Sequence, residues 1–193
     1  MLLRGAQMYN KMPTPRINKL EKNAPYFITI TVIEWLNIFT NKEYFDCLIN
    51  CLKYCQKNLG LLLYEYVIMT NHIHLIVQAR EGYSLSKIIG SFKQFTTKEI
   101  LVLLQNDRRK YIIRILENSF SKKEGYENQI WQRENYPELI ESEKFLQQKV
   151  EYIHNNPVIK GYVDEPQHYI FSSARNRYLD DNSIIELDNN IYQ

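Results

Sequence analysis

The chain has 193 residues, of which 45% are hydrophobic and 24% charged, with a formal net charge of +2. This balance excludes a disordered chain and predicts a soluble globular domain. No apolar run approaches the roughly 18 residues of a membrane helix, and residues 1–22 lack the pattern of a secretory signal. The three cysteines, Cys47, Cys51 and Cys55, cannot form a disulfide framework, and their helical spacing favours small apolar core residues over a metal or redox cluster.

Charge is unevenly distributed along the chain. Residues 1–22 carry five basic and one acidic side chain, residues 105–123 carry six and two, and residues 179–193 carry four acidic and no basic ones. Such patches suit a phosphate-binding surface, although charge alone is equally typical of a solvated face. We expect a basic N-terminal arm (1–24), a domain over residues 25–178 and an acidic C-terminal tail (179–193).

The first half of the chain predicts three strands and two helices. Residues 25–33 alternate between apolar and polar side chains, which predicts a strand. Apolar residues recur at helical spacing over 41–58, before Gly60. Residues 61–69 and 73–78 predict two more strands around a tight turn at 70–71, and Ser84 begins a second amphipathic helix.

The second half is less regular. Residues 105–125 are charged and lack a clear period, so we expect an insertion or loop there. Residues 129–132 are a candidate fourth strand, and residues 142–156 predict a helix that Pro157 ends. This order indicates an α+β fold: a ferredoxin-like split βαβ unit, with an antiparallel sheet, helices on one face and an added C-terminal helix.

Two histidines on one strand are the first candidate for chemistry. His72 and His74 are two residues apart, so we expect both imidazoles to leave the same face of the strand, an arrangement that suits half of a divalent-metal site. The alternative is a pair of polar residues on a solvated face. No cysteine lies near them in sequence, so oxygen ligands would complete the shell, which suits Mg²⁺ or Mn²⁺.

The last predicted helix supplies the second candidate. Tyr152 and Asn156 are four residues apart and therefore share a face of that helix. The alternative for Tyr152 is packing at the edge of the core, because a phenol with a pKa near 10 is a poor nucleophile without activation. His154 points away from Tyr152 on a helix, so we expect it to be structural, and we expect His168 to lie on the surface.

Several stretches together resemble the single-tyrosine HUH transposases, and among them the REP-associated tyrosine transposases. They are Met69–Val77 (MTNHIHLIV), Ser84–Ile89 with Phe92–Thr96, Ile130–Gln132, Glu151–Val158 (EYIHNNPV) with Gly161 and Val163, and Tyr169–Ala174. Each is weak alone, but their shared order over residues 25–178 is specific.

The resemblance implies an enzyme that binds single-stranded DNA carrying hairpins and cleaves and rejoins it through a 5′-phosphotyrosine. It implies that Tyr152 is the nucleophile and that His72, His74 and Asn156 hold Mg²⁺ or Mn²⁺. No P-loop pattern is present, so we expect no nucleotide cofactor. We also expect no membrane partner and a cytoplasmic, nucleoid-associated protein, and the family leaves a monomer and a homodimer open.

The DNA contacts are expected from polar and basic residues in three places. The candidates are Lys93 and Gln94, then Arg108, Arg109 and Lys110, then Ser172, Ser173, Arg175 and Arg177. For all of them the alternative is an ordinary solvated surface. Two other functions stay open: a regulator on the same fold that binds DNA hairpins with little cleavage, and a two-histidine phosphoesterase, whose second His-x-Thr/Ser motif is missing.

Overall fold

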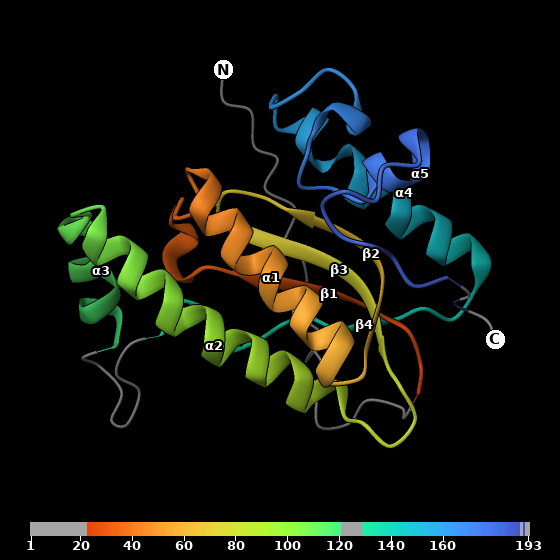
Figure 1. The fold of residues 1–193 in the computed structure, drawn as a ribbon, viewed down its shortest axis with the longest axis horizontal. Helices are drawn as coiled ribbons and strands as arrows, with labels where there is room; N and C mark the ends of the chain where they lie inside the picture. The colour runs from red at the N-terminus through yellow and green to blue at the C-terminus, as the bar shows by residue number, and fades with distance from the viewer. Residues whose placement is uncertain (1–22, 121–128, 190, 192–193) are drawn as a thin grey trace, which may run out of the picture.

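The computed structural model describes residues 23–120, 129–189 and 191 (Figure 1). The expected basic arm therefore lies outside the described residues except for its last two. One antiparallel sheet has the order β2-β3-β1-β4. Its strands are β1 (Tyr26–Thr31), β2 (Leu61–Ile68), β3 (His72–Ala79) and β4 (Glu138–Leu139). The helices are α1 (Lys42–Asn58), α2 (Leu85–Asn106), α3 (Lys110–Phe120), α4 (Glu143–Ile159) and α5 (Ala174–Leu179), with short 3-10 helices η2 (Ile33–Trp35) and η3 (Pro166–His168).

Strand alternation gives the sheet two apolar faces and therefore two cores. Ile28 and Ile30 of β1 face the larger core, which α1 and α2 cover. Phe27 and Ile76 face the smaller core, which Ile153 of α4 closes from the opposite side. Figure 1 shows α1 and α2 side by side across one face, with α4 and α5 apart from them. The ferredoxin-like fold class is confirmed, including the helix added after the sheet.

The fourth strand is not where the sequence predicted it. Residues 129–132 make only an isolated bridge between Trp131 and Val32, and β4 is instead Glu138–Leu139, opposite Tyr26 and Phe27. The Trp131 side chain is buried, and its indole donates to Thr96 Oγ1 at 2.9 Å. Side-chain contacts with α2, including this one, thus hold the segment in place without a continuous strand ladder.

The segment expected to be a loop is mostly helical. α2 runs to Asn106, and α3 covers Lys110–Phe120 before the undescribed residues 121–128. Ile112 and Leu116 of α3 are buried in the larger core. Their i, i+4 spacing gives α3 a narrow apolar stripe, and the charged residues that hid this period occupy its solvent side.

Pro157 does not end α4, which continues to Ile159. A proline inside a helix lacks one N–H, but here it stands in the last turn, so only one intrahelical bond is lost. The amide of Lys160 still donates to the carbonyl of Asn156 at 3.1 Å.

The acidic C-terminal residues 179–189 belong to the domain and are not a separate tail. Ile185 and Leu187 are buried in the larger core. The amide of Asp188 donates to the carbonyl of Leu63 at 2.8 Å, and its carboxylate accepts from the amide of the same residue at 2.9 Å. No helix in the described part of the chain has the length and apolar character to cross a membrane.

Candidate active site

The two histidines of β3 lie together on the face of the sheet that α4 covers. His72 is 6% exposed and His74 is 4% exposed, and their ring centroids are 4.7 Å apart. Phe27 of β1 stacks on His74, and Trp35 packs edge-on against His72. The rigid strand and the aromatic walls hold both imidazoles in place, as the spacing predicted.

Neighbouring polar groups orient both rings. His72 Nδ1 lies 2.7 Å from Asn71 Oδ1, and His74 Nδ1 lies 2.9 Å from Thr29 Oγ1. The carbonyl oxygen of Asn71 only accepts, so His72 donates through Nδ1 and keeps Nε2 unprotonated when the ring is neutral. The Thr29 contact leaves His74 Nε2 facing Tyr152. Outer hydrogen bonds of this kind fix the tautomer of a metal-binding histidine.

Both imidazoles are neutral at physiological pH. Burial, with the charge of Lys160, lowers the pKa of His72 to about 4. Burial, with the neighbouring His72 and Lys149, lowers the pKa of His74 to about 3. The neutral imidazole is the form that binds a metal ion.

Helix α4 brings Tyr152 and Asn156 to the histidines. Tyr152 Oη lies 3.4 Å from His74 Nε2, and its ring packs edge-on against Phe27 and His74. Tyr152 remains 45% exposed, so a ligand can reach its hydroxyl. Asn156 is buried one turn later, close enough to His72 and Tyr152 for its amide to influence the pKa of both side chains.

A charged pair lies beside Tyr152. Lys149 Nζ lies 2.8 Å from a carboxylate oxygen of Glu138 and 4.4 Å from the centroid of the Phe27 ring. Burial and the charge of Glu138 raise the pKa of Tyr152, and the hydrogen bond from Asn156 opposes this shift. The Tyr152 hydroxyl is therefore protonated at neutral pH, and a role as a nucleophile would require its activation.

The three predicted ligands fit a divalent ion. Asn156 Oδ1 is buried without a hydrogen-bond partner, although its amide lies among His72 and Tyr152. A buried, unpartnered amide oxygen next to two neutral imidazoles is a suitable third ligand. No three His, Cys, Asp or Glu side chains gather within the described residues, so among these residues Asn156 is the candidate for a third ligand beside the histidines.

The predicted DNA contacts on α2 border a hollow of about 710 Å³ between α2 and residues 129–133. Lys93 Nζ donates to the carbonyl of Gln132 at 2.7 Å, and burial lowers the pKa of Lys93 to about 8. Gln94 is exposed on the next position of the helix. We call the hollow between α2 and residues 129–133 the α2 hollow. Its lining contains three cations, three glutamines and no acid: Lys93, Lys98, Arg133, Gln94, Gln129 and Gln132, with Gly90, Thr97, Leu101 and Trp131.

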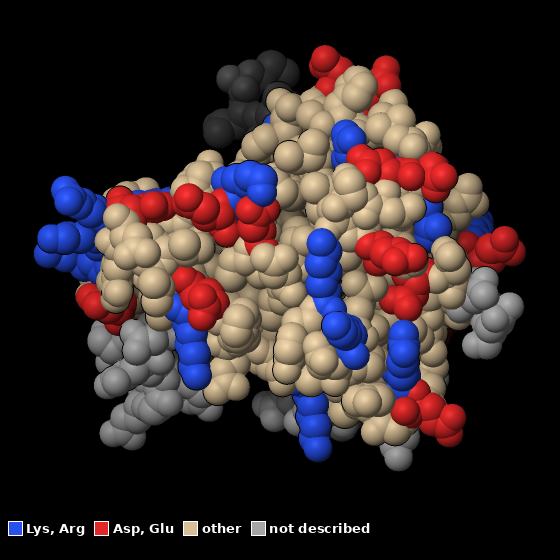
Figure 2. Space-filling model, in the orientation of Figure 1, with Lys and Arg blue, Asp and Glu red and all other residues tan. Residues whose placement is uncertain are grey.

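The predicted contacts at the start of α3 divide into two kinds. Arg109 donates to the carbonyls of Asn37 and Ile38 at 2.8 and 2.6 Å, so it ties this corner to the loop before α1. Arg108 and Lys110 are exposed. Figure 2 shows Lys and Arg side chains gathered at the α3 end of the molecule, while charges of both signs mix elsewhere on that face.

The C-terminal candidates lie in the interior or are paired with acids. Ser172 and Ser173 are fully buried and cannot reach DNA, because their segment pairs with the edge of β2. Arg175 Nη2 lies 2.6 Å from Asp181, and Arg177 Nε lies 2.7 Å from Glu65. The predicted DNA contacts at Ser172 and Ser173 are therefore wrong, whereas Arg175 and Arg177 remain partly exposed and their predicted contacts stay a prediction.

Sequence reasoning missed three residues that support the site. Thr29 and Asn71 orient the histidines, and the strand pairing that brings Thr29 opposite His74 is not evident from local sequence. Glu65, on β2, is buried beside His154, as expected of a structural histidine. A lone acid within the apolar stretch Leu61–Ile68 is a signal that could have identified it.

Comparison with known proteins identifies the family. The family described as "Transposase IS200 like" matches residues 22–156, which is more than half of the chain. The chain belongs to the IS200-like transposase family. This transposase shares its fold with a solved REP-associated tyrosine transposase bound to a REP hairpin, at 19% identity over 88% of each chain and a TM-score of 0.61. A putative transposase from Deinococcus radiodurans also matches, at 17% identity over 75% of this chain and 97% of the other, with a TM-score of 0.44. A comparison of this chain with curated proteins found no match.

Proposed function

We propose that this transposase is a strand transferase that binds hairpin-containing single-stranded DNA and cleaves and rejoins it through Tyr152. The observation that supports the proposal most directly is the convergence of four side chains from β3 and α4. Tyr152 Oη lies 3.4 Å from His74 Nε2, while the Asn156 side chain is buried one helical turn away and influences the pKa of both Tyr152 and His72. A nucleophile, two neutral imidazoles and an unpartnered amide oxygen are the groups that phosphoryl transfer by tyrosine needs.

In the proposed reaction, Tyr152 Oη attacks the scissile phosphorus while the P–O3′ bond breaks. The downstream fragment is then linked to the enzyme as a 5′-phosphotyrosine. The upstream fragment of the same strand leaves with a 3′-hydroxyl, and the phenol loses a proton while the 3′ oxygen gains one. Attack by another 3′-hydroxyl reverses the step and rejoins DNA. One phosphodiester replaces another at each stage, so no nucleotide cofactor is required.

The proposed cofactor is Mg²⁺ or Mn²⁺, held by His72, His74 and Asn156. When bound, such an ion polarises the scissile phosphate and stabilises the charge that develops on it. The surrounding residues keep these ligands ready: Asn71 holds the His72 tautomer, and Thr29 contacts His74. The Phe27 ring packs against His74 and Tyr152 and shields that side of the site.

For DNA binding we propose the α2 hollow, which includes the predicted contacts Lys93 and Gln94. Its cations attract phosphate, and its glutamine amides can both donate to and accept from base edges. Because Lys93 is tied to the carbonyls of residues 132 and 133, we assign it to shaping the hollow and place Gln94 and Lys98 at its contact surface. Arg108 and Lys110 are proposed as further phosphate contacts, and the REP hairpin of the solved relative supports a hairpin ligand.

Incubation with labelled single-stranded hairpin DNA from the flanks of the gene, with Mg²⁺ or Mn²⁺, tests the proposal on a denaturing protein gel. We expect a metal-dependent covalent protein–DNA band. Tyr152→Phe keeps the ring contacts with Phe27 and His74 but removes the hydroxyl, so it should bind the hairpin and form no band.

Hairpin binding without a covalent band in either metal would contradict the enzymatic proposal and favour the hairpin-binding regulator. Absence of both binding and the band with flanking DNA, and with hairpins from related repeats, would contradict the DNA partner as well.

A further inference from the structure

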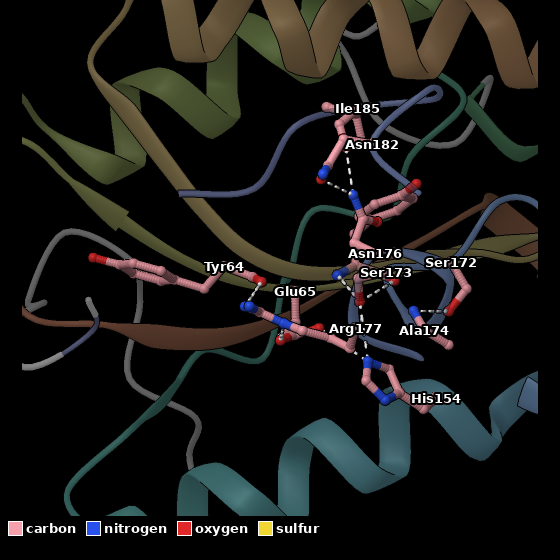
Figure 3. Close-up of polar contacts among 11 residues, drawn as sticks. Tyr64, Glu65, His154, Ser172, Ser173, Ala174, Asn176, Arg177, Asn182 and Ile185 are labelled. Carbon is pink, nitrogen blue, oxygen red and sulfur yellow. Dashed lines mark hydrogen bonds and ion pairs between the residues drawn. The ribbon is translucent and has the colours of Figure 1, made fainter. Parts of the chain in front are cut away.

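Helix α4 carries half of the proposed active site, because Tyr152 and Asn156 both belong to it. A buried polar cluster joins the same helix to β2 through the neighbouring residue His154 (Figure 3). It consists of Glu65, His154, Ser173 and Arg177, and we call it the α4 clasp. We propose that the α4 clasp is a positioning device that fixes the rotation of α4 and holds Tyr152 on the histidines of its own chain.

The hydrogen bonds of the clasp are specific in direction. His154 Nε2 lies 2.9 Å from Glu65 Oε2 and 3.2 Å from Ser173 Oγ. A carboxylate only accepts, so His154 Nε2 is the donor. Arg177 Nε donates to the other carboxylate oxygen at 2.7 Å. Each oxygen of Glu65 therefore has one donor, and Figure 3 shows the two donors approaching from α4 and from the C-terminal segment.

A β-bulge places Glu65 where it can bind α4. The pairing of β2 with β3 shifts between Leu63 and Glu65, so Leu63 faces Val77 and Glu65 faces Ile76. Ile76 belongs to the face covered by α4, and so does Tyr64. The extra residue therefore turns a carboxylate toward α4 that strict alternation would have turned into the larger core.

The helical positions explain why this contact controls Tyr152. Ile153 is fully buried against the sheet, and Tyr152 and His154 leave the helix about 100° to either side of it. Tyr152 points to β1 and β3 through Phe27 and His74, while His154 points to β2. If α4 rolled about its axis, the Tyr152 hydroxyl and His154 would move together, so a fixed His154 fixes the nucleophile.

Burial makes the contact resistant to small displacements. The side chains of Glu65 and His154 are 4% and 3% exposed. A roll that separated them would leave a carboxylate oxygen inside the protein without a partner, which is costly in a medium of low dielectric. Apolar packing of Ile153 has no comparable directional requirement, and it tolerates rotation that the clasp does not.

The clasp is formed within one chain, and so is the contact between Tyr152 and His74. β2, α4 and the segment 172–177 supply all four of its residues. An arrangement in which α4 reached the histidines of a second copy would have to exchange these buried bonds for the same bonds to that copy. We infer that the proposed strand transfer uses the nucleophile and the histidines of the same molecule.

Four variants test the positioning role. His154→Leu removes the donor, whereas His154→Gln keeps an N–H close to the position of Nε2. Glu65→Gln removes the charge at nearly constant size. The control is Asp181→Asn, which breaks the ion pair with Arg175 in the same C-terminal segment without touching α4. Thermal melting of all four establishes the folded fraction.

The first readout needs no DNA, so it is independent of the proposed function. Hydrogen exchange of the α4 amides should accelerate in His154→Leu and Glu65→Gln, and should stay near wild type in His154→Gln and Asp181→Asn. Equal α4 protection in His154→Leu and Asp181→Asn would overturn the clasp, even if the wild-type protein formed no covalent adduct with any DNA.

The second readout is the single-turnover rate of adduct formation at saturating hairpin. His154→Leu should lower this rate by about 10- to 100-fold, the scale of a displaced reacting group, with little change in hairpin affinity. His154→Gln should recover most of the rate. A loss confined to the amplitude, with a wild-type rate, would indicate only a smaller folded fraction and would overturn the positioning role.

Mixing two inactive proteins tests the restriction to one chain. Tyr152→Phe keeps its histidines, and His74→Ala keeps its tyrosine. If α4 serves only its own chain, the mixture forms no adduct. An adduct that appears on mixing would overturn this inference.

Discussion

Asn156 is a buried amide whose oxygen has no hydrogen-bond partner, an arrangement that costs free energy in the folded protein. Such a cost is typical of functional sites, and it agrees with the proposed role as a ligand. We expect Asn156→Ala to weaken Mn²⁺ binding by about tenfold or more. Titration calorimetry of the metal-free protein with Mn²⁺ measures this change.

The neighbouring residue offers a matched control for this prediction. Asn155 is exposed, and its amide donates to the carbonyl of Glu151 at 2.9 Å, on the solvent side of α4. Asn155→Ala should therefore bind Mn²⁺ as the wild type does. Equal Mn²⁺ affinity in the two alanine variants would remove Asn156 from the ligand set.

The residues of the site differ in how far the sequence could predict them. His72 and His74 were predicted to share a face because strand alternation is a local rule, and Tyr152 and Asn156 because helical spacing is another. That the two pairs meet depends on tertiary packing, which the family resemblance implied. The burial of Ser172 could not be foreseen, because it depends on a segment that pairs with a strand more than 100 residues earlier.

At the scale of elements, α3 is a helix within a segment that was predicted to be an insertion or loop. Leu116 is 2% exposed and packs in the larger core, whereas Arg114 on the opposite side is exposed. We expect Leu116→Ala to lower the free energy of unfolding by about 2–4 kcal/mol, since it leaves a cavity in the core. Arg114→Ala should change it by less than about 0.5 kcal/mol. Urea unfolding followed by circular dichroism measures both, and similar midpoints would show that α3 adds little to the core.

The accuracy of the predicted elements follows the strength of their periodicity. β1, α1, β2, β3 and α2 were predicted nearly in place, because each has a repeating apolar face or, in β2 and β3, a short run of mostly apolar residues. β4 has only two residues, too few to show a period. The fourth strand was predicted at residues 129–132, several residues before its actual position. Pro157 misled because a proline in a last turn removes only one hydrogen bond.

Across the whole molecule, the proposed catalytic residues and the α2 hollow lie on opposite faces of the sheet. The segment 129–133 joins them, because the amide of Gln132 donates to the carbonyl of Thr31, and Thr31 pairs with His72. A DNA strand bound in the α2 hollow would pass around this edge to reach Tyr152.

We expect Lys98→Ala to weaken hairpin affinity and to lower the slope of its salt dependence by about one. Fluorescence anisotropy at several salt concentrations measures this slope, with the exposed Lys53→Ala on α1 as control; equal slopes in the two variants would place the DNA elsewhere.

The edges of the sheet bear on the assembly of the whole molecule. An uncovered edge strand invites pairing with a second copy, but here the C-terminal segment occupies the outer edge of β2. The amide of Ile68 donates to the carbonyl of Phe171. The amides of Ser173 and Asp188 donate to the carbonyls of Tyr66 and Leu63, respectively. At the other edge, β4 has only two residues and offers little to pair with.

We therefore expect a monomer in solution, which agrees with an active site formed within one chain. Light scattering after size exclusion should give the mass of one chain at low and at high micromolar concentration. Asp188→Ala removes the carboxylate that accepts from the Leu63 amide and should expose part of the β2 edge. If that variant alone gains mass at high concentration, the C-terminal segment is what prevents edge pairing. A wild-type protein with the mass of two chains would contradict the prediction, and the mixing experiment with Tyr152→Phe and His74→Ala would then show whether such a dimer shares its active sites.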